Sequence, residues 1–294
     1  MFIAITQVLF VYCIVHPVFA QEGINPNIHG WYFILLMLSS VLIAAAGYII
    51  NDYFDLNIDL VNKPDKLVVD KIINRRWVIL WHLLLSIAGI AIALVIDLKT
   101  NARFLSIVNT GCVALLFLYS ITLKKKLLSG NILISILTAW VILAVAYCET
   151  SNLINSIGFS TEKIIRITLL YAGFAFIISL VREVVKDMED IEGDRKYGCY
   201  TMPIAWGMNA SKVFIAVWLV VLITALLIVQ FYVLQFHWWW SAAYCIVLII
   251  IPLLLIFRKL YSATTSHDYH QLSTWIKLTM FTGILSMIFF RFYL

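Results

Sequence analysis

The sequence has few charged residues and no segment that resembles a flexible linker. Only 13% of its 294 residues are Asp, Glu, Lys or Arg, whereas 63% are hydrophobic, and the mean hydropathy is +0.97. The 5 prolines and 12 glycines are too sparse to form a Pro/Gly-rich linker or a low-complexity region. No soluble globular domain needs so much apolar surface, so the composition excludes that class and indicates a polytopic membrane protein.

Cysteine is also scarce, and its pattern excludes two kinds of site. The 5 cysteines stand singly, most of them in apolar segments. Their spacing fits neither a metal-binding pair nor a disulfide framework. The formal net charge of +5 is explained by basic loops on one side of a membrane, so we expect no nucleic-acid partner.

Apolar runs of about 17–22 residues predict nine membrane-spanning helices. No positively charged region precedes the first run, so we interpret it as a retained helix rather than a signal peptide. The predicted spans are 2–20, 31–50, 77–96, 104–123, 131–148, 164–181, 213–234, 238–257 and 275–293.

Lys and Arg residues predict the orientation of these spans. With a cytoplasmic N-terminus, the connections 51–76, 124–130, 182–212 and 258–274 lie inside and hold 15 of the 21 basic residues. The other six are expected in outer connections or near helix ends: Lys99, Arg103, Lys163, Arg166, Lys277 and Arg291. We therefore expect a multi-pass protein, in a bacterial inner membrane, with the motifs described next on its cytoplasmic side.

Two sets of three aspartates are the most informative feature of the sequence. Each set has gaps of three and then four residues, and the second set lies 135 positions after the first: Asp52, Asp55, Asp59 and Asp187, Asp190, Asp194. On a helix this spacing places three carboxylates along one face. Six carboxylates around a common space repel one another unless cations lie between them, and Mg²⁺ bridging a phosphate-bearing substrate is the natural cation. Two solvated acidic loops are the alternative, which the repeated spacing disfavours.

The offset of 135 residues covers about four spans and predicts an internal duplication. We expect an all-α membrane protein with one domain, 1–294, in which two pseudo-repeated four-helix units and one further helix surround a central cavity. The halves are expected at about 1–130 and 131–294. Repeat-built membrane proteins place their sites between the repeats, so one aspartate set from each half should face the cavity. Gly193 is expected to end the helix that carries the second set.

Basic residues flank both aspartate sets and suit the oxygens of a polyphosphate. They are Lys63, Lys66, Arg182, Lys186, Arg195 and Lys196. Arg182 is the strongest candidate, because a free charge at a helix exit near the hydrocarbon is costly. Mg²⁺, basic residues and apolar walls together suit a substrate with a diphosphate head and a hydrocarbon tail. Departure of metal-bound diphosphate from an allylic carbon leaves a cation that an acceptor can attack. Aromatic faces could shield that cation, with Tyr48, Tyr53 and Tyr119 as candidates.

The motifs resemble those of the UbiA-type intramembrane prenyltransferases. Asn51-Asp52-x-x-Asp55-x-x-x-Asp59 is similar to the first signature of that family, and Asp190-x-x-x-Asp194 to the second. The likeness includes the nine expected helices and the pair Tyr119 and Lys124 at the end of the fourth. It implies that Asp52, Asp55, Asp190 and Asp194 hold Mg²⁺, assisted by Asp59 and Asp187. It also implies that Asn51, Lys124 and Arg182 contact the diphosphate.

The resemblance implies Mg²⁺-dependent transfer of a polyprenyl group from a prenyl diphosphate to a lipophilic, membrane-associated acceptor, with Mn²⁺ as a substitute metal. The run from Arg182 to Asp194 most resembles the digeranylgeranylglyceryl phosphate synthase branch. That branch implies geranylgeranyl transfer to geranylgeranylglyceryl phosphate, forming an ether lipid. An aromatic or quinone-precursor acceptor remains open, as does the prenyl length.

Two readings outside prenyl transfer are less favoured. A transporter or cation channel should place its acids near the bilayer midplane, whereas here they lie at span ends. A non-catalytic relative is disfavoured by the intact aspartate sets. The run His267-Asp268-x-His270 in the last cytoplasmic connection offers two histidines three residues apart without a nearby third ligand. We interpret it as a solvated loop rather than a metal site.

Overall fold

The computed structural model of the chain describes residues 2–100, 102–151 and 159–293, and most of these are helical. Within those ranges, 8 helical spans are long and apolar enough to cross a membrane, and Leu105–Ile121 is a shorter apolar helix. Helices suit a bilayer because they satisfy their backbone hydrogen bonds internally. The prediction of an all-α, polytopic membrane protein is therefore confirmed.

The first half of the chain holds five of the predicted spans in order. The first is interrupted by a π-helical turn, Val11–Val15. The helices are α1 (Phe2–Phe10), α2 (His16–Gln21), α3 (Trp31–Asn62), α4 (Arg75–Lys99), α5 (Leu105–Ile121) and α6 (Ser129–Thr150).

The second half holds the remaining four spans and two short helices at the motif end. A π-helical turn, Ile246–Ile250, joins α11 to α12 within one span. The helices are α7 (Phe159–Glu189), α8 (Ile191–Lys196), α9 (Met202–Ala205), α10 (Met208–Leu234), α11 (Trp239–Cys245), α12 (Ile251–Ser262), α13 (Ser266–Leu285) and α14 (Ile288–Tyr293).

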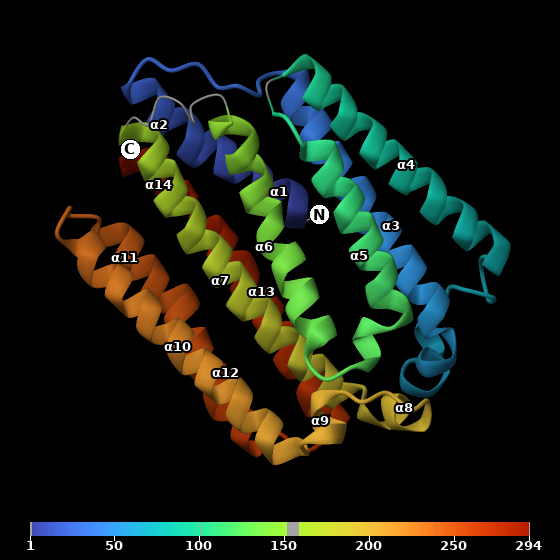
Figure 1. Cartoon of the computed structure of the whole chain (residues 1–294). Helices are drawn as coiled ribbons and strands as arrows, with labels where there is room; N and C mark the ends of the chain where they lie inside the picture. Colours follow the sequence, from blue (N-terminus) through green and yellow to red (C-terminus); the bar gives the residue numbers. More distant parts are fainter. Residues whose placement is uncertain (1, 101, 152–158, 294) are drawn as a thin grey trace.

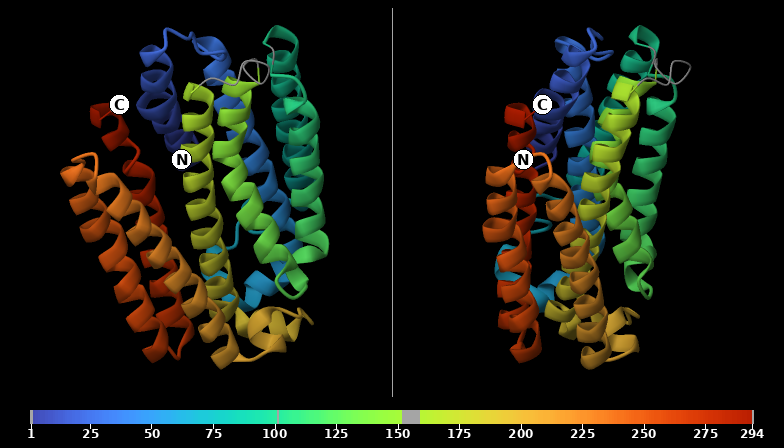
Figure 2. Two further views of the ribbon diagram at one scale, coloured as in Figure 1. Left: turned by 60° about the vertical axis from the view of Figure 1, so that its left-hand side comes forward. Right: turned by 90° about the vertical axis from the view of Figure 1, so that its left-hand side faces the viewer.

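The long helices lie roughly side by side as one bundle (Figure 1). The group α3, α4 and α5 forms one flank, the group α10, α11 and α12 forms the other, and α1, α6, α7 and α13 lie between them. Figure 2 shows that α8, α9 and the connection after α3 gather at one end of the bundle. Both aspartate sets approach that end, so the fold brings the two motifs together.

Two helices continue beyond their predicted membrane spans and into the aspartate motifs. The predicted span 31–50 is exceeded by α3, which continues to Asn62, and the predicted span 164–181 is exceeded by α7, which continues to Glu189. The 32 residues of α3 extend over about 48 Å, more than the roughly 30 Å of a hydrocarbon core. The first motif therefore lies on a helix that projects beyond the apolar layer.

The last connection on the motif side is much shorter than the expected 258–274. Here α12 ends at Ser262 and α13 begins at Ser266, with the Thr265 side chain accepting a hydrogen bond from the Asp268 backbone N–H. The first turns of α13 are polar, so hydropathy does not reveal where this helix begins. The predicted last span, 275–293, therefore begins nine residues too late.

The positions of several helices agree with the predicted 135-residue repeat. Shifting α4 by that offset gives 210–234, and α10 spans Met208–Leu234. Shifting α5 gives 240–256, which falls within the span formed by α11 and α12. The boundaries of the two halves stay a prediction, because helix spacing does not locate the seam between repeats.

Helices α3 and α4 form the most extensive helix pair, and a small residue allows their close approach. A Cβ added to Gly89 would lie 2.7 Å from Ile43 Cγ1 and 3.3 Å from the Ser39 carbonyl oxygen. The Ser39 hydroxyl donates to the Gly89 carbonyl at 2.7 Å and accepts from Asn109 Nδ2 at 3.1 Å. Small residues and interhelical hydrogen bonds of this kind stabilise helix packing in membranes.

We expect Gly89→Ala to weaken this packing. The added methyl group has to displace the branched Ile43 side chain or the α3 backbone, at a cost of roughly 1–3 kcal/mol in the free energy of unfolding. The measurement is the thermal unfolding midpoint of the purified protein in detergent. Gly111→Ala is the control, because a Cβ at Gly111 has no neighbour within 4 Å. Equal midpoints for the two variants would contradict the role assigned to Gly89.

Candidate active site between the two aspartate sets

The first motif is organised by one lysine from the turn between α5 and α6. Lys124 Nζ forms an ion pair with Asp55 Oδ1 and also donates to Asn51 Oδ1 at 3.3 Å. Asn51 Nδ2 donates to Asp55 Oδ2 at 2.6 Å, so both oxygens of this carboxylate are bound. The pair is well shielded from solvent, with the Lys124 and Asp55 side chains 9% and 17% exposed. The predicted neighbours Asn51, Asp55 and Lys124 are thus together.

A glycine allows Lys124 to stand so close to the neighbouring helix. A Cβ on Gly130, in the first turn of α6, would lie 2.8 Å from Lys124 Cα and 3.0 Å from Tyr119 Cε2. Tyr119 and Lys124 are therefore both packed against the start of α6. Backbone atoms cannot move aside cheaply, so the turn requires a residue without a side chain at position 130.

The second aspartate set is predicted to lie along one continuous helix, but in the structure it is divided between two helices. Helix α7 ends at Glu189, and Asp190 is the joint residue before α8. Asp187 therefore belongs to α7 and Asp194 to α8. The expectation that Gly193 ends the helix is also wrong, because Gly193 lies inside α8.

Asn62, which the sequence does not single out, explains why a glycine stands at position 193. Its Nδ2 donates to the Asp190 carbonyl at 3.0 Å, and its Oδ1 accepts from the Gly193 N–H at 2.8 Å. A Cβ on Gly193 would lie only 2.5–2.6 Å from the Asn62 amide group. The last residue of α3 therefore binds the joint between α7 and α8 through two hydrogen bonds.

Three further contacts join the second motif region to the end of α3 and to the turn and helix after α5. Lys63 Nζ pairs with Asp190 Oδ2 at 2.7 Å, and Asn131 Nδ2 donates to Asp187 Oδ2 at 2.8 Å. The Tyr200 N–H donates to the Lys125 carbonyl at 2.8 Å. Asn131, like Asn62, escapes prediction, because a single asparagine outside the aspartate spacing carries no recognisable signal in one sequence.

The remaining predicted residues are placed less uniformly. Asp59 lies on α3, where it interacts electrostatically with Asp55, Lys63 and Asp190. Asp52 is exposed and lines a small apolar pocket beside Val69 and Trp81, outside the main cavity. The exposed Lys196 ends α8, and the side chain of Lys66 lies outside the described part of the structure.

The donor atoms of the site fit a hard divalent cation. Burial, together with the nearby carboxylates of Asp190 and Asp55, raises the pKa of Asp194 to about 7, and a cation bound beside Asp194 would favour its charged form. Among the described residues, no group of three or more His, Cys, Asp or Glu side chains is placed to hold one metal ion. Mg²⁺ needs no such group, because it commonly binds one or two carboxylates and completes its shell with phosphate oxygens and water.

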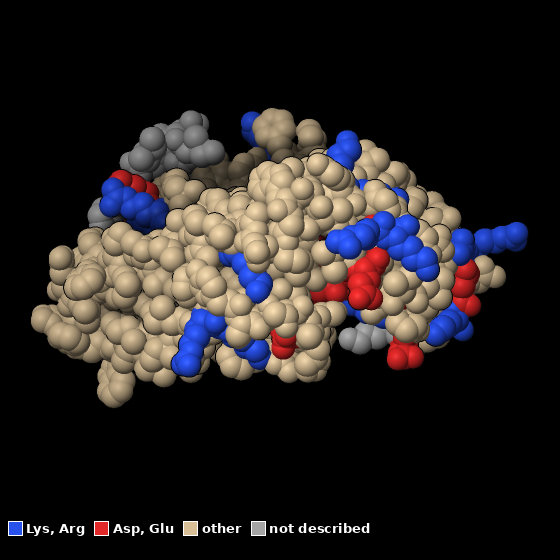
Figure 3. Space-filling view, turned by 90° about the horizontal axis from the view of Figure 1, so that it is seen from below, with Lys and Arg blue, Asp and Glu red and all other residues tan. Residues whose placement is uncertain are grey.

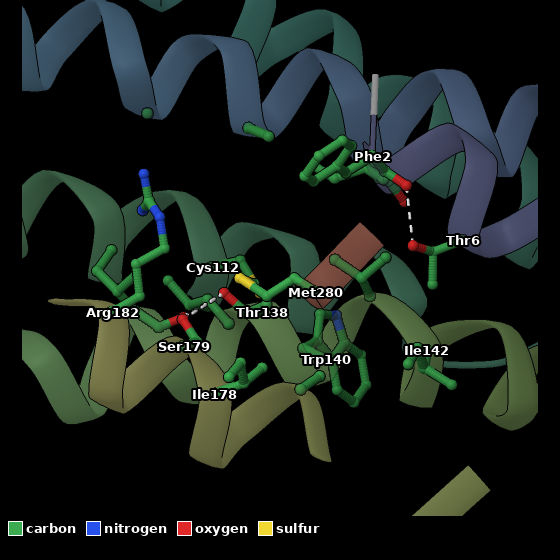
Figure 4. A pocket seen from close by; sticks show the side chains of 18 of the residues that line it. Phe2, Thr6, Cys112, Thr138, Trp140, Ile142, Ile178, Ser179, Arg182 and Met280 are labelled. Carbon is green, nitrogen blue, oxygen red and sulfur yellow. Dashed lines mark hydrogen bonds between the residues drawn. The ribbon is translucent and has the colours of Figure 1, made fainter. Parts of the chain in front are cut away.

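A cavity of about 550 Å³ opens beside the first motif, a size typical of ligand sites. Asn51, Tyr119, Arg182, Glu183 and Lys186 line one part of it, and the rest of the wall is mostly apolar. Figure 4 shows the Arg182 side chain projecting into this space from α7, near Ser179 of the same helix. The cavity thus combines cations with apolar walls, as the sequence predicts.

Arg182 is incompletely satisfied in this cavity. Its Nη1 pairs with Glu183 Oε1 at 3.0 Å, but its buried Nε has no hydrogen-bond partner. A buried donor without a partner costs about 1–3 kcal/mol, so an anionic ligand that reached it would be bound favourably. Glu183 belongs to the run from Arg182 to Asp194 that carries the resemblance, but its position in the cavity wall emerges only from the fold.

Viewed from the motif end, acidic and basic side chains lie next to each other on a face that is otherwise uncharged (Figure 3). The histidines of the last connection belong to other contacts. His270 Nδ1 pairs with Glu189 at 2.8 Å, His267 contacts Gln271, and Asp268 caps the start of α13. These residues form a helix start, so the expected solvated loop is corrected to an ordered first turn.

We expect Asn62→Ala to loosen α8 without unfolding the bundle. The Gly193 N–H loses its acceptor, at a cost of roughly 1–3 kcal/mol, so hydrogen exchange at 190–197 should accelerate about tenfold or more. Hydrogen–deuterium exchange with mass spectrometry measures this directly. Asn57→Ala, at an exposed position on the same helix, should leave exchange in α8 unchanged. Unchanged exchange in Asn62→Ala would refute the assigned role of Asn62.

Part of the chain is similar to known synthases of a prenylated glycerol phosphate. It is 34% identical over 196 residues to the digeranylgeranylglyceryl phosphate synthase of Methanothermobacter thermautotrophicus, with 64% of this chain and 62% of that protein covered. The corresponding synthase of Methanosphaera stadtmanae is 29% identical over 183 residues, with 62% and 61% covered. The matched segments span less than two thirds of the length of these relatives.

Solved structures share the fold over nearly the whole chain. A UbiA homolog from Aeropyrum pernix K1 superposes with a TM-score of 0.68 at 15% identity, covering 96% of each chain. A UbiA homolog from Archaeoglobus fulgidus, bound to DMAPP and Mg²⁺, gives 0.55 at 16% identity, covering 97% of this chain and 96% of that one. The profile of the UbiA prenyltransferase family matches residues 8–284, and the chain belongs to that family.

Proposed function

We propose that this protein transfers a prenyl group from a prenyl diphosphate to a lipophilic acceptor, with Mg²⁺ as its metal and Mn²⁺ as a substitute. The observation that carries the proposal is the adjacency of two environments. Asn51, which contacts Asp55 and Lys124 in the first motif, also lines an apolar cavity together with Arg182 and Lys186 of α7. A diphosphate with a long hydrocarbon tail needs both environments in one site. Membership of the family supports the same reaction.

The aspartates of the two motifs are the residues that would hold the metal. Asp55, Asp59, Asp190 and Asp194 surround the contact between α3 and α8, with Asp187 behind them and Asp52 on the exposed side of α3. Divalent metal, when bound there, supplies positive charge that stabilises the leaving diphosphate. The clustering of carboxylate oxygens, with Asp190 and Asp55 close enough to Asp194 to raise its pKa, supports this assignment.

Side chains of the chain itself would bind and orient the donor. Arg182 and Lys186 line the cavity and can hold diphosphate oxygens. Lys124, which pairs with Asp55, would contact the same diphosphate. In the reaction, the bond between the allylic carbon and the diphosphate oxygen breaks, and the acceptor hydroxyl oxygen forms a bond to that carbon and loses its proton. The face of Tyr119 would shield the allylic cation, and the apolar walls would exclude water.

The acceptor that we favour is geranylgeranylglyceryl phosphate, with geranylgeranyl diphosphate as the donor and an ether lipid as the product. The relatives named as digeranylgeranylglyceryl phosphate synthases support this choice. The chain also has cations beyond those paired with motif aspartates or assigned to the donor, including Lys125, Lys126 and Lys196. An acceptor that carries its own phosphate would use such spare cations.

The membrane orientation is part of the proposal. The protein is an integral membrane protein by its helices and family, and we place the motif end on the cytoplasmic side of a bacterial inner membrane. The basic residues Lys63, Lys125 and Arg195 at that end support the cytoplasmic assignment. The same end position of the acids disfavours a transporter, which would need them near the midplane.

A product assay tests the reaction and its metal together. Purified protein with Mg²⁺, geranylgeranyl diphosphate and geranylgeranylglyceryl phosphate should yield the ether, detected by mass spectrometry. Excess EDTA should abolish the product because the carboxylate cluster repels an anionic diphosphate without metal, and Mg²⁺ or Mn²⁺ should restore it. Full activity in EDTA would eliminate the metal role. A product formed only with an aromatic acceptor would refute the acceptor while leaving prenyl transfer intact.

If each half contributes metal ligands, replacing an aspartate in either half should lower the turnover rate to a similar degree. Asp55→Asn and Asp190→Asn should each lower kcat on the order of 10²-fold or more, because metal charge stabilisation is worth several kcal/mol. Steady-state kinetics at saturating Mg²⁺ measure the effect. Asp65→Asn, an exposed acid in the connection after α3, serves as the control. Near wild-type turnover in either motif variant would exclude a shared site.

A further inference from the structure

Lys277 lies in the interior of α13, which runs from Ser266 to Leu285, although the sequence predicts it in an outer connection or near a helix end. This helix is part of a candidate membrane span. Lys277 lines the same cavity as Arg182 and Lys186, and it is exposed, so a ligand in the cavity can reach it. Charged residues inside membrane spans are costly and mark functional sites more often than structural ones.

The packing of α13 against α7 fixes the height of Lys277 in the bundle. The two helices are antiparallel: Ser266 Oγ donates to the Glu189 carbonyl at 2.9 Å, and at the other end Ser286 hydrogen-bonds Tyr171 at 2.9 Å. This register places Lys277 about level with Ser179. Arg182 lies three residues further along α7, which is about 4.5 Å along the helix axis. Lys277 and Arg182 are therefore cations at nearly the same depth of one cavity.

Lys277 approaches the cavity from a different wall than the first aspartate set. Helix α13 packs against α7 and α1, whereas α3, which carries the first set, packs against α4, α5 and α8. The Lys277 ammonium group lies 5.8 Å from the centre of the Phe2 ring. Within the described part of the chain, no Asp or Glu forms an ion pair with it, whereas Lys63, Lys124 and Arg182 each have one.

We propose that Lys277 binds the phosphate monoester of a lipid acceptor, in a subsite separate from that of the donor diphosphate. This inference rests on the proposed prenyl transfer and names the acceptor's recognition group. An unpaired ammonium at this depth favours an anion. The donor diphosphate already has the aspartates, Arg182 and Lys186 at its end of the cavity. A second anion in the same cavity belongs to the other substrate, and its position would direct the acceptor hydroxyl toward the donor.

Comparison of two acceptors tests the subsite. Wild type and Lys277→Met are assayed with geranylgeranylglyceryl phosphate and with geranylgeranylglycerol, which lacks the phosphate. Loss of Lys277 should raise the KM for the phosphorylated acceptor about 10–100-fold, as expected for a hydrogen bond between charged groups. It should leave the KM for the neutral alcohol and for the prenyl diphosphate unchanged. Lys277→Arg keeps the charge and should restore most of the phosphate preference.

Lys259→Met is the matched control, because Lys259 also lies over an aromatic ring, 5.0 Å from the centre of Trp275, but does not line the cavity. It should behave as wild type with both acceptors. An equal effect of Lys277→Met on both acceptors, or no effect, would overturn the proposal. A loss of affinity confined to a hydroxybenzoate acceptor would overturn the phosphate assignment in favour of a carboxylate.

Direct binding separates this proposal from the proposed reaction. Tryptophan fluorescence, read without any prenyl donor, reports binding of each acceptor to wild type and Lys277→Met. If wild type turns over no prenyl donor, the proposed function fails, and the binding comparison still decides whether Lys277 selects the phosphate. Tighter binding of the phosphorylated lipid by wild type than by Lys277→Met supports the subsite, and equal binding excludes it.

Discussion

Charge compensation between segments far apart in the chain is the constraint on which the site depends. Carboxylates at the rim of a membrane protein are expensive to leave without partners, and each of the two paired aspartates receives its lysine from another segment. Lys124, in the turn after α5, holds Asp55, and Lys63, just after α3, holds Asp190. Because removing one partner of such a pair leaves a buried charge, these contacts fix the relative positions of α3, α7 and α8.

The helix break at Asp190 fixes the direction of α8, and with it the position of Asp194 relative to the first motif. Had α7 continued, Asp194 would project away from the bundle along the helix. Instead α8 changes direction, and Asn62 binds the Asp190 carbonyl and the Gly193 N–H on either side of the joint. These hydrogen bonds cost little to make, but only a glycine leaves room for them. One asparagine and one glycine, 131 residues apart, thus set the distance between the motifs.

The cavity separates two chemical tasks along its walls. Its charged part, at Arg182 and Lys186, suits the head of an anionic substrate, whereas its apolar part suits hydrocarbon and excludes water. Lys277 adds a cation from the α13 wall at a similar height. Positive charge on two walls and carboxylates at one end allow two anionic groups to be held at different places. That arrangement is what a reaction joining two amphipathic lipids requires.

The sequence by itself determined the fold class and named candidate residues for the site. Apolar runs of membrane length predict helices because a bilayer leaves the backbone no other partners, and the repeated spacing alone marks Asp55, Asp190 and Asp194 as candidate metal ligands. Only the tertiary structure revealed Asn62, Asn131 and the places of Glu183 and Lys277 in the cavity. It also ended α7 at Glu189 rather than at Gly193 and turned Asp52 to the exposed side. These features depend on contacts between residues far apart in the chain, and local spacing carries no information about such contacts.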